Sequence, residues 1–226
     1  MFIFFGLLGP FTARYLSDIV SRLGSNVQLT VTAAVPADGV RQYLGNIMQL
    51  GLLTAIAAAA GAFAFDGESE LAAFLRTRVR SMQVLVLARF AVWAPATAVV
   101  FALGTAAAWY ETRVLIGSLG VEAMLFGTLY GALYFAFVIS LVALAASIAR
   151  GVLGTVVVTY ALIAGVSLLG LVPTIGEWLP GRLANAMLGL LTDATPAQYV
   201  RSAIVGAVAA SLALWVAGIR LSHREL

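Results

Sequence analysis

Apolar runs of about 20 residues recur along this chain, and short charged segments separate them. Each residue advances an α-helix by about 1.5 Å, so a run of this length can cross the hydrocarbon core of a bilayer. A soluble fold could not cover so much apolar surface, since 62% of the 226 residues are hydrophobic and only 10% are charged. The pattern therefore predicts an all-α, polytopic membrane bundle.

We expect one transmembrane domain over residues 1–226, with five complete spans and a truncated first span. The apolar run 1–10 is too short to cross a bilayer alone and forms the partial span. An outer loop at 11–41 follows, with a short helix and then an extended piece. A cytoplasmic helix at 66–82 and short outer helices at 173–200 separate later spans. The complete spans are expected at 43–65, 84–110, 121–149, 152–172 and 202–219.

Composition excludes several kinds of site. The chain has no cysteine, which rules out disulfides, a thiol nucleophile and cysteine metal ligands, and its single histidine, His223, cannot form a histidine cluster. Every basic residue is an arginine, and the arginines are scattered over the loops, so we expect no nucleic-acid partner. No GxxxxGK[ST] loop is present to bind nucleotide phosphates. We therefore expect no catalytic, cofactor or metal site in this chain.

The segment Phe65–Arg80 has the clearest polar pattern. Acidic residues begin it and arginines end it, which is the charge order that a helix dipole favours. Its apolar residues at i, i+3 and i+4 form one stripe. We predict a short amphipathic helix along the membrane surface, either anchored to lipid headgroups or docked on a cytoplasmic partner. The residues expected to dock are Asp66, Glu68, Glu70, Leu71, Phe74, Leu75, Arg76, Arg78 and Arg80.

A few residues within the spans are candidates for helix packing or for a translocation path. Asn46 and Gln49 lie three apart on one face, where they either line a path or hydrogen-bond between helices. Gly127 and Gly131 have the GxxxG spacing that lets helices approach closely. Glu122 is either a functional intramembrane acid or an ordinary residue at the end of a helix.

The arginines favour one orientation. The side that holds the segment 66–82, the connection at Arg150 and the C-terminus carries arginines close to the span ends, where they weigh most in the positive-inside rule. We therefore expect 66–82 and the C-terminus to be cytoplasmic.

Three stretches resemble the membrane subunits of type 2 family ABC transporters: FFGLLGPFTARYLSDIV, YLGNIMQLGLL and the acidic-to-basic segment that ends VRSMQVLVLARF. Asp66 takes the acidic position of the family pattern, and Arg89 with Phe90 takes its Lys-Phe position. Two features depart from it: Glu70 and Leu71 replace a Gly-Thr pair, and Val79 replaces a proline between Arg78 and Arg80.

The resemblance implies the type 2 ABC permease fold, with 66–82 as the coupling helix. It also implies a cell-membrane exporter built from two permease subunits, identical or closely related, and two ATP-binding subunits that bind ATP and Mg. The family has a further cytoplasmic helix and the first half of a span before residue 1. Either the protein begins further upstream, or this chain lacks that contact.

Two other classes of function remain open from the residues alone. A membrane-embedded enzyme or assembly factor would need titratable groups clustered in one leaflet. A secondary transporter that acts without an ATPase is typically built from inverted repeats with broken helices at the midplane, and the sequence shows no such symmetry.

Overall fold

A computed structural model describes residues 1–23, 34–64 and 81–223. These residues form helices and short connections, and no strand occurs among them. Five of the helical segments are long and apolar enough to cross a membrane. The all-α class and the expectation of a multi-pass membrane bundle are therefore confirmed. The five segments are Pro36–Phe63, Met82–Leu115, Val121–Ile148, Gly151–Leu169 and Ala197–His223.

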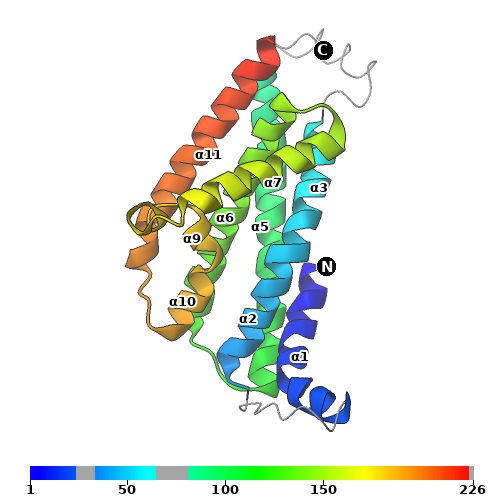
Figure 1. Cartoon of the computed structure of the whole chain (residues 1–226), viewed down its shortest axis with the longest axis vertical. Helices are drawn as coiled ribbons and strands as arrows, with labels where there is room; N and C mark the ends of the chain where they lie inside the picture. The colour runs from blue at the N-terminus through cyan, green and yellow to red at the C-terminus, as the bar shows by residue number, and fades with distance from the viewer. Residues whose placement is uncertain (24–33, 65–80, 224–226) are drawn as a thin grey trace.

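Most of these helices run along the long axis of the molecule (Figure 1). The span Pro36–Phe63 is built from three consecutive pieces, α2, η1 and α3, and the segment between the fourth and fifth spans contains three short helices, α8, α9 and α10. The helices are α1 (Phe2–Leu23), α2 (Pro36–Asn46), η1 (Ile47–Gly51), α3 (Leu52–Phe63), α5 (Met82–Leu115), α6 (Val121–Ile148), α7 (Gly151–Leu169), α8 (Pro173–Gly176), α9 (Gly181–Ala184), α10 (Ala186–Thr192) and α11 (Ala197–His223).

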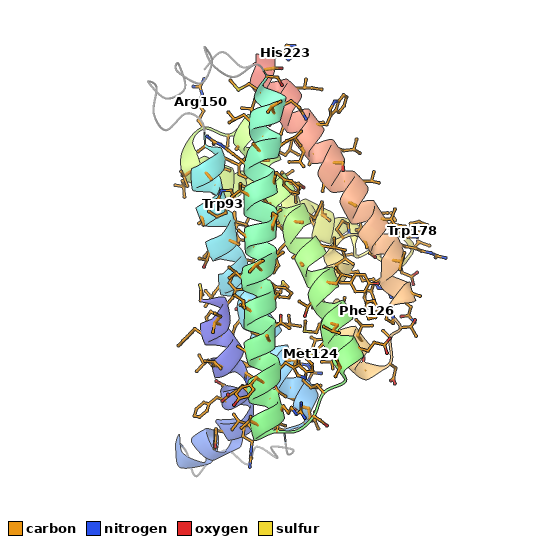
Figure 2. The ribbon with its side chains drawn as sticks, turned by 180° about the vertical axis from the view of Figure 1, so that it is seen from behind. Trp93, Met124, Phe126, Arg150, Trp178 and His223 are labelled. Atoms are coloured by element: carbon orange, nitrogen blue, oxygen red, sulfur yellow. The ribbon has the colours of Figure 1, made fainter. Side chains whose placement is uncertain are left out.

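The two ends of the bundle gather different segments. The end of α3, the start of α5, the turn from α6 to α7 and the end of α11 lie together at one end (Figure 1). Arg150 and His223 mark this end in Figure 2. The start of α2, the end of α5 and the start of α6 lie at the opposite end.

The structure differs from the expected boundaries in the first 41 residues. The helix α1 continues through Pro10 to Leu23, where the sequence predicts a partial span and then an outer loop that contains a separate short helix. The later part of α1 turns away from the bundle axis (Figure 1).

The first complete span also begins earlier than its apolar pattern indicates. Pro36 occupies the first turn of α2, and the Asp38 carboxylate accepts a hydrogen bond of 3.0 Å from the Val35 amide. Both features are start signals for a helix. The span therefore includes Arg41, which the apolar pattern leaves in the outer loop.

The core lies around α6. Its most apolar stretch is 72% buried, whereas that of α7 is 11% buried, so α6 is the central helix and α7 a peripheral one. Phe135 of α6 is fully buried, with its ring 5.2 Å from that of Phe101 and 5.6 Å from that of Phe2. The Tyr43 ring stacks on that of Phe101 with 6.4 Å between the ring centres. One aromatic cluster thus joins α1, α2, α5 and α6.

Glycines bring α1 against α5. A Cβ added at Gly104 would lie 2.9 Å from the Phe2 carbonyl oxygen and 2.7 Å from the Tyr43 hydroxyl oxygen. A Cβ at Gly6 would lie 3.0 Å from the Cβ of Ala107. Such distances are too short for carbon atoms, so this crossing requires glycine, as close helix contacts in membranes often do.

We expect Gly104→Leu to destabilise the bundle by about 1–3 kcal/mol, because the added side chain would have to separate α1 and α2 from α5. The loss should appear as a lower midpoint in thermal unfolding of the detergent-solubilised protein. Gly165→Leu is the matched control, since a Cβ at that mid-span glycine would meet no heavy atom within 4 Å. An equal loss in both variants would contradict the close crossing.

Candidate functional site

A stripe of polar and small residues follows one face of the span α2–η1–α3. Its residues lie four, three and four apart, which keeps them on one side of a helix. At about 1.5 Å per residue, the stripe extends for about 16 Å, or about half of the hydrocarbon thickness. It starts at the end of the bundle where α2 begins. The stripe consists of Asp38, Gln42, Gly45 and Gln49, with Asn46 beside it.

The amides of this stripe have no partner in the described part of the chain. Gln42 and Gln49 are exposed and Asn46 is half-buried, and none of the three makes a side-chain hydrogen bond to a described residue. A Cβ at Gly45 would meet no heavy atom within 4 Å. An amide that faces hydrocarbon without a partner costs several kcal/mol on alkane-transfer scales, about 4–8. The stripe therefore requires water or polar groups opposite it.

The stripe ends in a π-helical segment, η1. The Leu52 N–H donates to the Ile47 carbonyl, five residues earlier, so this turn contains one residue more than an α-helical turn. Gln49 lies inside the segment. Single π turns within α-helices occur frequently at functional sites, and their extra residue turns the following helix by about 100°. The polar stripe and the irregular turn thus coincide at Gln49.

An ion pair lies at the end of the stripe where α2 begins. The Arg41 Nη1 lies 2.9 Å from Asp38 Oδ1, one turn along α2. The Arg41 side chain is 62% exposed and that of Asp38 34%, so the pair is open to solvent and contributes about 0.3–0.5 kcal/mol at most. It places fixed charges at the entrance of the stripe while the interior carries only neutral amides.

The chemistry that this arrangement supports is recognition or passage of polar groups. The stripe contains hydrogen-bond donors and acceptors but no serine, cysteine or histidine nucleophile. Across residues 1–23, 34–64 and 81–223, no three His, Cys, Asp or Glu side chains come together as metal ligands would. The stripe is therefore a candidate translocation path or a subunit contact.

Of the two amide residues singled out from the sequence, Gln49 lies in the stripe and Asn46 lies beside it. Asp38, Arg41 and Gln42 belong to the same face, but the predicted site omits them because the expected outer loop extends to residue 41 and the expected span begins at 43. The spacing of Asp38, Gln42, Gly45 and Gln49 is the signal that could have found them.

The two glycines of the GxxxG pair contact residues of this same chain. A Cβ at Gly127 would lie 2.7 Å from the Cβ of Met187, so Gly127 makes room for α10. Gly131 makes room for the ring of Phe101 on α5. Both glycines are buried, and each receives a different neighbour from within the fold.

Glu122 lies in the first turn of α6, where its side chain is exposed. An acidic residue at this position is favoured by the positive end of the helix dipole. The residues of the expected docking helix, Asp66 to Arg80, lie outside the described residues.

The helix ends on either side of that segment, in α3 and α5, contact other helices of the bundle. The Arg89 guanidinium of α5 donates to the carbonyl oxygen of Ala62 in the last turn of α3. The last carbonyls of a helix lack partners within the helix, and a cation is favoured there. Gln83, in the first turn of α5, packs against Gly218 of α11. The end of α3, the start of α5 and the last part of α11 are therefore held together by these contacts.

The chain as a whole is a multi-pass helical membrane protein by the length and apolar character of its five spans. Comparison with protein-family models, curated proteins and solved structures finds no match. The likeness to ABC permease subunits therefore depends on the sequence patterns alone.

The absence of native cysteine allows a direct test of the stripe. We expect a cysteine at Gln49 to react with a charged, water-soluble thiol reagent at least about tenfold faster than one at Leu103, because only a thiolate reacts and thiolates do not form in lipid. Leu103 is a mid-span residue of α5 with 52% of its surface exposed. Labelling rates are measured on the two single-cysteine variants in native membranes. Equal rates would show that Gln49 faces lipid.

Proposed function

We propose that this chain is the transmembrane permease subunit of an ATP-driven ABC exporter in the cell membrane. Two copies, or one copy and a close paralogue, form the pathway. Two separate ATP-binding subunits bind ATP with Mg and dock on the cytoplasmic segment 66–82. The permease chain converts their closure into movement of its own helices.

One observation carries this proposal: a single span connects the expected docking segment to the polar stripe. The segment 65–80 follows α3 directly, and α3 continues through the π turn into the stripe of α2. A force applied at the end of α3 reaches Gln49 through one continuous helix. This is the connection that a subunit driven by a partner requires.

The distribution of charge supports the orientation. Arg150 and the end of α11 lie at the same end of the bundle as the flanks of 65–80 (Figure 2), and the last turn of α11 contains Arg220. In the proposed orientation this end is cytoplasmic, in agreement with the positive-inside rule. The short helices α8 to α10 then belong to the outer half of the bundle.

Copurification tests the partner. We expect an ATP-binding protein encoded beside this chain to copurify with it, and the complex to hydrolyse ATP. Phe74→Asp or Arg76→Glu should reduce the bound ATPase several-fold, because the first inserts a charge into the apolar stripe and the second inverts a docking charge. Thr77→Ser on the same segment is the control. If no ATPase copurifies, or if both variants retain it fully, the proposal fails.

Thiol labelling tests the source of energy. In the Gln49→Cys complex we expect ATP with vanadate, which traps a closed ATPase, to change the labelling rate of the cysteine. Dissipation of ion gradients with ionophores should leave that rate unchanged. The opposite pattern, a response to ionophores and none to ATP, would favour a secondary transporter. No response to either would favour the membrane enzyme or assembly factor.

A further inference from the structure

The segment between α7 and α11 contains a polar pocket of about 500 Å³. Two guanidinium groups and one carboxylate line it, from Arg182, Arg201 and Glu177, together with Gln198 in the first turn of α11. Trp178 lies beside this region, next to α11 (Figure 2). Tryptophan and tyrosine favour the headgroup level of a bilayer, and this segment has both.

Aromatic rings hold the two arginines in place. The Arg182 Cζ lies 5.1 Å from the centre of the Tyr199 ring, and the Arg201 Cζ lies 5.3 Å from that of Trp178. Tyr199 is buried, with its ring 5.5 Å from that of Tyr130. A guanidinium that rests on a ring keeps the donors along its edge available, and that edge fits two oxygens of a phosphate.

The charges of the pocket are not neutralised by one another. Within the described residues, no ion pair within 4 Å and no hydrogen bond engages the guanidinium groups of Arg182 and Arg201 or the Glu177 carboxylate. The backbone of Glu177 is nevertheless fixed, because the buried Ser202 hydroxyl donates to its carbonyl oxygen at 2.7 Å. The pocket thus presents cationic donors and a separate anionic acceptor from a fixed frame.

A second pocket, of about 550 Å³, shares two of these residues. Glu177 and Arg182 form part of its wall, and most of the rest is apolar or glycine, including Val166, Leu171 and Leu179. Charged groups therefore stand where a polar pocket meets an apolar one. A molecule that fits both would have a charged head and an apolar tail.

We propose that these paired pockets bind a phospholipid whose headgroup carries a primary amine. The phosphate lies against the guanidinium groups of Arg182 and Arg201, and the ammonium donates to the Glu177 carboxylate. The acyl chain follows the apolar wall of the second pocket. This site is independent of the proposed ATP-driven function, since it requires neither an ATPase nor a transported substrate.

Native mass spectrometry of the purified full chain, exchanged into mixed micelles with one lipid at a time, tests the site. We expect more retained phosphatidylethanolamine than phosphatidylcholine, because a quaternary ammonium cannot donate a hydrogen bond to Glu177. Arg182→Gln or Arg201→Gln should weaken retention about tenfold, since each removes charge-assisted hydrogen bonds. Arg220→Gln, at the far end of α11, is the control and should change nothing.

Glu177→Gln should reduce the preference for phosphatidylethanolamine over phosphatidylcholine, because it removes the anionic acceptor, while retaining binding through the phosphate. Arg182→Lys should retain more lipid than Arg182→Gln, which separates loss of charge from loss of fold. Retention that is equal in the wild type and both glutamine variants of the arginines would overturn the site. Displacement of the lipid by millimolar inorganic phosphate would also overturn it, because the ligand would then be free phosphate.

Discussion

Backbone polar groups within a bilayer must find hydrogen-bond partners inside the protein, and this constraint organises the whole chain. In the five long helical spans, the backbone groups satisfy this constraint with hydrogen bonds inside the helix. The segment between α7 and α11 meets it through side chains of neighbouring helices. Tyr130 of α6 donates to the Pro196 carbonyl oxygen at 2.8 Å, and Ser202 of α11 does the same for Glu177. Two short helices of this segment, α9 and α10, lie beside α6.

The sequence predicts the elements that obey this constraint directly. Spans two to five begin and end within a few residues of the expected positions, because apolar composition and helix length are local properties. The start of α2 is harder to predict from the sequence, since Asp38, Arg41 and Gln42 are polar and yet lie within the helix. In a hydropathy pattern such residues resemble those of a loop. Their spacing from Gln49 along the chain shows that they share one face of a helix. The shared face, rather than hydropathy, identifies them.

Contacts between distant residues could not be predicted in the same way. The spacing of Gly127 and Gly131 predicts that something approaches α6 closely, but it does not say what. Met187 and Phe101 supply the two contacts, and they come from opposite directions along the chain. The Arg182 and Arg201 pocket is similar, because only the return of α11 beside α8 and α9 brings those arginines together. The local sequence pattern identifies a small or charged residue, but the arrangement of the helices in space determines which residue it contacts.

The π turn η1 shows how local helix geometry and packing against the core are connected in this span. One face of α2 is buried at Val40 and Leu44 and continues to Ile47 at the start of η1. An uninterrupted α-helix would carry that face well away from the one that Ile56, Ala59 and Ala60 bury on α3. The extra residue in η1 takes up about 100° and brings both halves against the same core. The same turn leaves Gln49 on the outside. Packing of the span and exposure of its amide therefore have one cause, and a change in this turn would rotate α3 relative to the stripe.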